Sequence, residues 1–266
     1  MSKDYYETVG RYYDKDSHDY DKRYWSNSIL QNIRQEFREE LYKISFSNAL
    51  EIGFGTGIDL IHFGRNLPDR NFFGLDVSKE MVQITKSKIK SENLGNIKVK
   101  YGSSDSISEN FPNKKFDLIY VFFGALNTVE NFNNSARILY KNLNEDGHII
   151  VSFVNKFYLA DIFINLMKLN LNKAFLRQKK IWGGYSPTKF LESKCVSAKE
   201  VRKAFLFDGI EIKRKGFSIT YPAWYRDSLR KKLGFLNKYL SIFDDILNKT
   251  PLWQFGEYSF FIFKKK

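Results

Sequence analysis

Three glycines at alternate positions constrain the fold of this chain of 266 residues more than any other feature. Gly53, Gly55 and Gly57 follow a short apolar strand and precede the start of a helical pattern. Because glycine has no Cβ and tolerates positive φ, such a turn lets the backbone approach a small ligand closely. The helix that follows directs unpaired N–H groups and a positive dipole end at the same place. Glu51 is an unusual residue for a buried strand, and a ligand with a cation and free hydroxyls would explain its presence.

Two nucleotide-binding patterns compete for this turn, and a tight turn without a ligand is a third alternative. The dinucleotide fingerprint G-x-G-x-x-G places its third glycine where this chain has Ile58. The chain instead reads G-x-G-x-G, with Glu51 two residues before the first glycine. Residues 71–76 predict a second strand that ends in Asp76, at the spacing of the ribose-binding acid of a βαβ unit. A carboxylate can accept hydrogen bonds from both ribose hydroxyls, which favours a nucleotide ligand over an empty turn.

The sequence after this carboxylate continues the alternation of helices and strands. Ser78 is expected to cap the next helix, and Val77 or Met81 to cover the face of an adenine ring. Three further strands are predicted, within residues 97–106, 116–126 and 143–153. Strands that alternate with helical patterns predict a mostly parallel sheet covered by helices on both faces.

These elements together, over about residues 44–155, resemble the class I S-adenosylmethionine-dependent methyltransferases of the small-molecule type. The resemblance implies an α/β, Rossmann-like, doubly wound sheet of seven mostly parallel strands, with S-adenosyl-L-methionine as cofactor. It implies that Asp105 accepts a hydrogen bond from the adenine amino group and that Phe123 lies beside the methionine part. The expected cofactor-binding residues are Tyr20, Glu51, Gly53, Gly55, Gly57, Asp76, Val77, Met81, Asp105, Ser106 and Phe123.

The N-terminal segment contains two Tyr-Asp pairs seven residues apart, the first at Tyr13 and the second at Tyr20. Many small-molecule methyltransferases, including those of the ubiquinone-biosynthesis type, begin with a similar segment. The likeness implies that this segment folds over the cofactor, with Tyr20 in contact and Tyr13 as a second candidate; a surface helix rich in aromatic residues is the alternative. We therefore expect a helical cap at residues 1–43, which includes an amphipathic helix at 28–43, before a core at 44–266.

Charge is distributed unevenly along the chain. Residues 1–150 contain 20 Lys and Arg against 21 Asp and Glu, whereas residues 151–266 contain 23 against 9. Solvated helix faces would explain this, and so would an anionic partner. The partners considered are an anionic small-molecule or lipid-like acceptor, an acidic carrier protein and an anionic membrane surface, ahead of nucleic acid.

Two insertions are expected to form a lid on the substrate side, at about residues 156–196 and 221–256. The first begins with one long predicted helix at 156–181, and the second contains a basic, aromatic stretch with helical spacing at 224–240. That stretch either packs on its own domain, lies on an anionic membrane or binds nucleic acid.

No metal site is expected, because Cys195 is the single cysteine and the three histidines are scattered. The lack of a disulfide partner, of a signal peptide and of a long apolar run predicts a cytoplasmic protein, with the membrane periphery left open. The sequence identifies no catalytic base.

Residues 122–125 follow the predicted fourth strand and lack the [D/N]-P-P-[Y/F] motif of the DNA and rRNA amino methylases. We therefore expect methyl transfer to an O or N atom of an anionic acceptor that is a small molecule, lipid-like or carrier-bound. An RNA or protein methyltransferase that docks through its basic C-terminal half is the alternative, followed by a non-catalytic nucleotide-binding protein.

Overall fold

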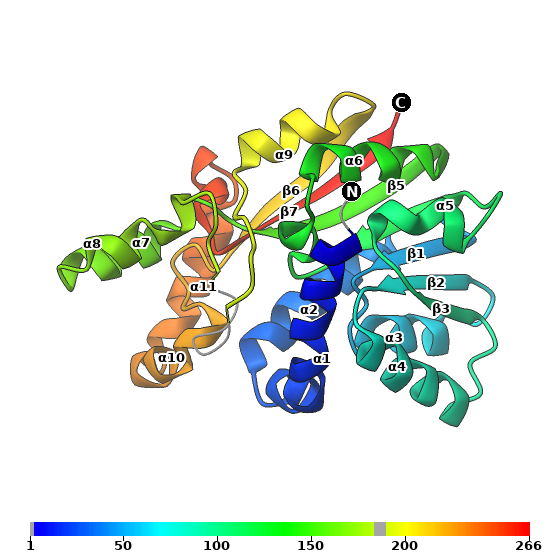
Figure 1. Cartoon of the computed structure of the whole chain (residues 1–266). Helices are drawn as coiled ribbons and strands as arrows, with labels where there is room; N and C mark the ends of the chain where they lie inside the picture. The colour runs from blue at the N-terminus through cyan, green and yellow to red at the C-terminus, as the bar shows by residue number, and fades with distance from the viewer. Residues whose placement is uncertain (1–2, 184–189) are drawn as a thin grey trace.

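The computed structural model describes residues 3–183 and 190–266 and contains one seven-stranded sheet in the order β3-β2-β1-β4-β5-β7-β6 (Figure 1). Strands β1 to β5 run parallel, and β7 runs antiparallel between β5 and β6. The strands are β1 (Asn48–Ile52), β2 (Asn71–Asp76), β3 (Ile97–Tyr101), β4 (Phe116–Val121), β5 (Leu143–Val154), β6 (Gly209–Phe217) and β7 (Tyr258–Lys265). This order confirms the predicted doubly wound, Rossmann-like α/β fold.

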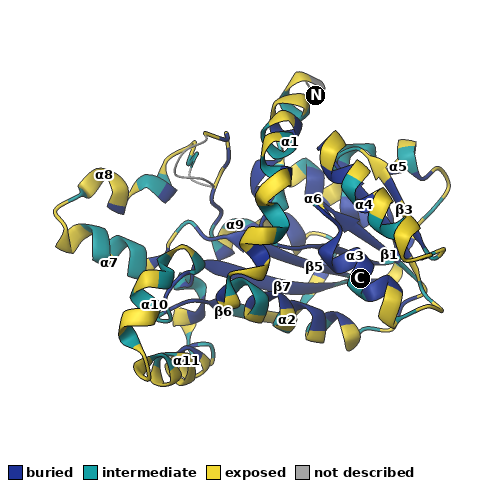
Figure 2. Cartoon of the chain, turned by 90° about the horizontal axis from the view of Figure 1, so that it is seen from below, coloured by how far each residue is buried: buried dark blue, intermediate teal, exposed yellow. Residues whose placement is uncertain are grey.

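Helices cover both faces of the sheet, because successive strand residues point to opposite faces and both sets are apolar. Ile119 and Val121 face one apolar cluster, under α6 and α9, while Leu118 and Tyr120 face the other, under α2 and α3. The central strands are mostly buried, as β5 and β7 show in Figure 2, whereas the edge strands β3 and β6 are partly exposed. The covering helices are α2 (Ser28–Tyr42), α3 (Ile58–Asn66), α4 (Lys79–Ser91), α5 (Ile107–Asn110), α6 (Phe132–Lys141) and α9 (Ala198–Phe205).

Local sequence signals set the ends of several helices. Asn27 caps α2, Ser78 caps α4 as predicted, and Ser197 forms a capping box at the start of α9. The amphipathic face predicted for α2 is confirmed, since its apolar positions at 29, 33, 37 and 41 are all buried. A 23-residue helix, α1 (Lys3–Trp25), precedes it and crosses the end of the sheet (Figure 1).

The predicted fourth strand was too long. Strand β4 ends at Val121, and the chain then turns through Phe123 (φ 51°) and Gly124 (φ 75°) into a short 3-10 helix, η2 (Ala125–Thr128). Two consecutive left-handed residues cannot continue a strand, so Phe123 leaves the sheet and turns toward the neighbouring cavity.

The long helices predicted in the two insertions are also broken. The first contains α7 (Leu159–Met167), α8 (Leu171–Ala174) and η3 (Leu176–Gln178), interrupted at Leu169, whose φ is 56°. Part of this insertion, residues 184–189, lies outside the described residues. The second contains η4 (Trp224–Arg226), α10 (Asp227–Leu233), α11 (Leu236–Leu247) and η5 (Pro251–Phe255), interrupted at Gly234, whose φ is 51°.

We refer to residues 156–181 as the first arm and to residues 222–250 as the second arm. Both arms project from the β6–β7 end of the molecule, away from β1, β2 and β3 (Figures 1 and 2). Arg226 of the second arm pairs with Asp161 of the first arm and so connects them. In the part of the chain that the structure describes, no helix has both the length and the apolar character needed to cross a bilayer.

Candidate functional site: a nucleoside-sized cavity and an adjoining cleft

The glycine turn forms one wall of a cavity at the carboxyl ends of β1, β2 and β4. Gly53 and Gly55 line the cavity with φ values of 74° and 58°, a region that other residues rarely adopt. Gly57 also has a positive φ, of 78°, but it packs on α4: a Cβ added there would lie 2.6 Å from a Thr85 methyl carbon. The first two glycines therefore shape the cavity, while the third allows α3 to pack against α4.

The cavity has an empty volume of about 700 Å³, part of which is open to solvent. Its walls come from α1, the glycine turn, the end of β2, the loop after β3 and the turn after β4. Seven of the predicted cofactor-binding residues line it: Tyr20, Gly53, Gly55, Asp76, Val77, Met81 and Phe123. Segments far apart in the sequence thus meet here, as predicted from the order of the strands.

Asp76 is the acidic residue of the cavity wall and is 6 % exposed. Its two carboxylate oxygens accept backbone hydrogen bonds from Gly55 and Ser78, each 2.8 Å long. Burial raises the pKa of Asp76 to about 6, although these backbone N–H groups act to lower it. Each carboxylate oxygen has a second acceptor position, so the group can still receive the two hydroxyls of a ribose.

Helix α1 closes the cavity from the outside. Tyr6, Tyr13 and Tyr20 line it, on one side of the helix. The sequence indicated Tyr20 and Tyr13 but missed Tyr6, whose hydroxyl donates a 2.6 Å hydrogen bond to Asp105.

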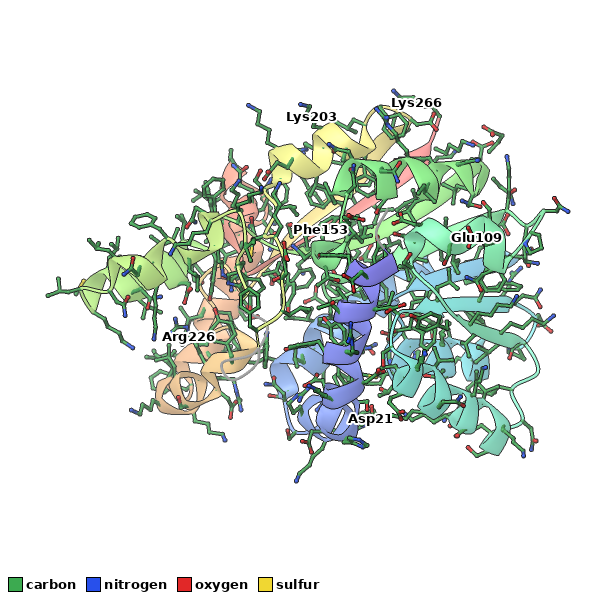
Figure 3. All side chains as sticks on the ribbon, in the orientation of Figure 1. Asp21, Glu109, Phe153, Lys203, Arg226 and Lys266 are labelled. Carbon is green, nitrogen blue, oxygen red and sulfur yellow. The ribbon has the colours of Figure 1, made fainter. Side chains whose placement is uncertain are left out.

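The aspartates of the two Tyr-Asp pairs attach α1 to the core. Asp14 accepts hydrogen bonds from the Ser78 hydroxyl (2.6 Å) and the Glu80 backbone (3.1 Å) at the start of α4. Asp21, at the opposite end of α1 from the N-terminus (Figure 3), pairs with Lys88 at 2.6 Å and accepts a hydrogen bond from Thr56. Residues seven apart lie on one helix face, so each pair places a tyrosine at the cavity and a carboxylate on the core.

Gly10 brings α1 close to the cavity and was not predicted. A Cβ added to this residue would lie only 2.2 Å from the carbonyl oxygen of Val77. A glycine within a long helix costs about 1 kcal/mol relative to alanine, so its presence there was a signal of close packing.

The other four predicted residues, Glu51, Gly57, Asp105 and Ser106, do not line the cavity. Ser106 is held in a capping box with Ser103. Asp105 lies beside the wall residue Ser104, and its Oδ1 atom is buried without a hydrogen-bond partner among the described residues. This acceptor atom could bind the amino group of a ligand. The predicted contact with adenine stays a prediction.

Glu51 belongs to a buried charge network behind the glycine turn. Arg34 and Arg38 both bind Asp59 at the start of α3, and the Arg34 guanidinium lies 4.6 Å from the ring centre of Phe123. Burial, with the nearby Asp59 charge, raises the pKa of Glu51 well above its usual range. Glu51 alternates with the cavity-lining Ile52 along β1, which explains why it faces this network. Its Oε2 atom is buried without a hydrogen-bond partner among the described residues, and its predicted cofactor contact stays a prediction.

A second, larger cleft adjoins the cavity. The space between them is lined by Tyr20 and Phe123 from the cavity side and by Trp224 and Tyr258 from the cleft side. The cleft has an empty volume of about 2090 Å³, including open solvent, and lies between the two arms. Arg226, which joins the arms, is one of its wall residues (Figure 3).

Glu257 is an acidic residue in the wall of this cleft, 2 % exposed and directly before β7. Arg177, also buried, lies 3.7 Å from its Oε1 atom and donates a 3.2 Å hydrogen bond to the hydroxyl of Tyr225. The Oε2 atom of Glu257 is buried and has no hydrogen-bond partner in the described parts of the chain. Burial raises the pKa of Glu257 to about 7, although Arg177 acts to lower it. No sequence pattern indicated this pair, because its two residues lie 80 positions apart.

Comparison with known proteins agrees with this geometry. Residues 49–147 match a family model described as a methyltransferase domain. The chain is 29 % identical over 260 residues to an uncharacterised protein of Methanocaldococcus jannaschii, covering 97 % of this chain and 90 % of that protein. It is 31 % identical over 104 residues to a demethylmenaquinone methyltransferase of Porphyromonas gingivalis, covering 39 % of this chain and 42 % of that enzyme.

Solved structures share the fold at low sequence identity. A putative sarcosine dimethylglycine methyltransferase from Galdieria sulphuraria has a TM-score of 0.56 and 13 % identity, covering 89 % of this chain and 86 % of that one. The N-methyltransferase NodS of Bradyrhizobium japonicum, in complex with S-adenosylhomocysteine, has a TM-score of 0.53 and 14 % identity, covering 91 % and 90 %.

Proposed function

Because this chain is a class I S-adenosylmethionine-dependent methyltransferase, we propose that it methylates an O or N atom of an anionic, small or lipid-like acceptor bound between its two arms. The observation that carries this proposal is the cleft, which a smaller pocket links to the cofactor cavity. Its wall includes a buried carboxylate with one oxygen that has no hydrogen-bond partner among the described residues.

The residues of the cavity fit the cofactor. Asp76 offers its carboxylate to the ribose, the apolar side chains of Val77 and Met81 suit an adenine face, and Tyr20 and Phe123 lie at the end that adjoins the cleft. When bound, S-adenosylmethionine supplies a methyl group that its sulfonium has already activated. The protein's main task is then to align an acceptor atom with that methyl group.

The charge of the cleft favours an anionic acceptor. Lys168, Lys173 and Lys232 line it, and none has an ion-pair partner among residues 3–183 and 190–266. The two acidic wall residues, Asp161 and Glu257, each have an arginine partner. Three uncompensated ammonium groups around a cleft attract and orient a carboxylate, phosphate or phenolate.

We further propose that Glu257 takes the proton of the acceptor. A hydroxyl or amine that donates to its free Oε2 atom would transfer that proton as the acceptor atom bonds to the methyl group. A carboxyl with a pKa of about 7 suits this role, because it is ionised near neutral pH and still basic. Arg177 acts as a positioning residue, since its guanidinium lies 3.7 Å from the Oε1 atom of Glu257.

A lipid-like acceptor is also supported by the similarity to demethylmenaquinone methyltransferases, although it covers only part of each chain. Such an acceptor requires access to a membrane, so we propose that the enzyme works at a membrane periphery. The alternative acceptors are RNA and protein, which would dock on the same basic half.

The test is transfer of a radiolabelled methyl group from S-adenosylmethionine to host extract, with the lipid, small-molecule, protein and RNA fractions counted separately. We expect label in the lipid or small-molecule fraction. Label confined to RNA or protein would contradict the proposed acceptor class.

Two variants test the cleft itself. The triple change Lys168→Gln, Lys173→Gln and Lys232→Gln should lower transfer by at least about tenfold through weaker acceptor binding. The matched control changes Lys86, Lys90 and Lys98, which lie on and beside α4, to Gln. Equal transfer by the two triple variants would argue that the cleft does not bind the acceptor.

A further inference from the structure

The tip of the first arm exposes large apolar side chains to solvent. Leu169 is 90 % exposed and Met167 is 71 % exposed, and Phe163 and Leu171 beside them are also exposed. Leu169, whose φ is positive, occupies the interruption between α7 and α8, two helices that project away from the sheet (Figure 1). Within the described chain no other segment covers these residues, so the arm leaves a continuous apolar tip uncovered.

The second arm exposes an apolar stripe. Phe235, Tyr239, Ile242 and Ile246 are spaced by four, three and four residues, which places them on one side of α11. All four are exposed, Phe235 at 78 %, whereas the buried residues of α11 are Asp244 and Leu247. The apolar side of this amphipathic helix therefore faces solvent, the reverse of the usual arrangement in a globular protein.

Basic residues accompany both apolar surfaces. The first arm contains six Lys and Arg against one Asp, and the second contains six against three. Lys179, Lys180 and Lys238 are exposed and have no ion-pair partner in the described parts of the chain. Apolar side chains flanked by cations are typical of helices that lie on an anionic bilayer.

We propose that the two arms form a membrane-docking surface that lies on an anionic lipid bilayer, with the cleft between them opening toward the lipid. The inference rests on the proposed function only in naming the source of the acceptor; the docking surface stands on its own observations. The apolar tips enter the headgroup region and the lysines contact the lipid anions.

Charge and chemistry favour a bilayer over other occupants. A second copy of the chain would bring two positively charged arms together, which like-charge repulsion opposes. Single-stranded nucleic acid could stack on the exposed rings of Phe163, Phe235 and Tyr239, but it would leave the aliphatic side chains of the same surfaces in water. These side chains are Met167, Leu169, Ile242 and Ile246. An acyl-chain region accepts aliphatic and aromatic side chains alike.

Vesicle co-sedimentation of the full chain tests the proposal. The vesicles contain either phosphatidylcholine alone or phosphatidylcholine with about three phosphatidylglycerol molecules in ten, at about 50 and 300 mM NaCl. We expect binding to the anionic vesicles at least about tenfold tighter than to neutral ones, and weaker at the higher salt. Equal binding to both, or binding to neither, would overturn the proposal.

Two variants locate the surface. The change Met167→Ser, Leu169→Ser and Phe235→Ser removes exposed apolar tips, and the change Lys179→Gln, Lys180→Gln and Lys238→Gln removes charges outside the cleft. Each should weaken vesicle binding by about tenfold or more. All six side chains are exposed, so the variants should retain the melting temperature of the parent.

Matched controls change the same residue types elsewhere. The α4-side triple variant at Lys86, Lys90 and Lys98 removes equal charge, and Ile210→Ser with Ile212→Ser removes exposed apolar side chains from β6. Both controls should bind vesicles like the parent. Loss of binding in the controls as well would mean that net charge or general hydrophobicity, and not the arms, drives the association.

Other outcomes are also decisive. Tight binding of the parent to an unstructured RNA oligonucleotide without vesicle binding would identify a nucleic-acid surface, and an arm-dependent dimer in light scattering would identify a second copy. If vesicle binding fails while label still transfers to detergent-solubilised lipid, the proposed function stands and the docking surface does not.

Discussion

The affinity of the cavity for S-adenosylhomocysteine should fall as the pH drops through 6, because Asp76 must be ionised to accept hydrogen bonds from the ribose. The pKa of its carboxyl in the free protein is raised to about 6 by burial. At pH 5 only roughly one carboxyl in ten would be ionised, so the affinity should be about tenfold lower than at pH 7.5, or about 1.4 kcal/mol. An Asp of ordinary pKa would show almost no change over this range.

Calorimetric titration at pH values between about 5 and 7.5 measures this directly. Asp76→Asn should bind more weakly at pH 7.5 by about 1–3 kcal/mol, through lost charged hydrogen bonds, and its affinity should not depend on pH. Asp117→Asn is the matched control, because Asp117 also accepts two backbone hydrogen bonds, from Ser47 and Asn48. Asp117 lies outside the cavity wall, and its pKa is lowered. This variant should therefore bind S-adenosylhomocysteine as the parent does. A flat pH profile for the parent, or a pH-dependent one for Asp76→Asn, would refute the assignment of Asp76 as the ribose acid.

Three further predictions follow from the geometry. Gly10→Ala should lower cofactor affinity at least about tenfold in the same titration, because the added Cβ would displace α1 from Val77. Unchanged affinity together with a higher melting temperature would show that α1 accommodates the methyl group. Asp59→Ala should lower the free energy of unfolding in urea by about 3–5 kcal/mol, since it leaves the buried Arg34 and Arg38 unpaired. Glu92→Gln, which breaks a surface ion pair with Arg65, should lower it by less than about 1 kcal/mol. Similar losses of unfolding free energy in the two variants would contradict this reasoning. The rate of methyl transfer should rise with pH through about 7 as Glu257 ionises. Glu257→Gln should transfer the methyl group at least about a hundredfold more slowly while it binds S-adenosylhomocysteine with unchanged affinity. If that variant kept the pH dependence of the rate, Glu257 would be excluded as the proton acceptor.

The parts of the fold that the sequence predicted are those determined by local patterns. The glycine turn, the strand that ends in Asp76 and the capping residue Ser78 each depend on a few consecutive residues. The interruption of the first arm was missed, because Leu169 adopts a left-handed backbone that its side chain does not favour. The second arm is interrupted at Gly234, a residue type that adopts positive φ readily, so the sequence did contain a local signal there.

The parts of the site that were missed depend on contacts between distant segments. Glu257 becomes a candidate proton acceptor only because the antiparallel β7 begins beside the carboxyl end of β5, where Arg177 of the first arm meets it. Gly10 matters only because α1 packs on the backbone of Val77. The buried charges around Glu51, from Arg34 and Asp59, likewise come from segments that are not consecutive with β1.

The attachment of α1 has a consequence for turnover. This helix supplies several side chains of the cavity wall, yet few of its residues are buried, and two aspartates hold it to the core through hydrogen bonds and an ion pair. These polar contacts lie outside the apolar layers of the sheet, so this attachment can open locally without unfolding the core. If release of the demethylated cofactor requires this opening, weakening the contacts of Asp14 or Asp21 would speed turnover without touching the residues that contact the acceptor.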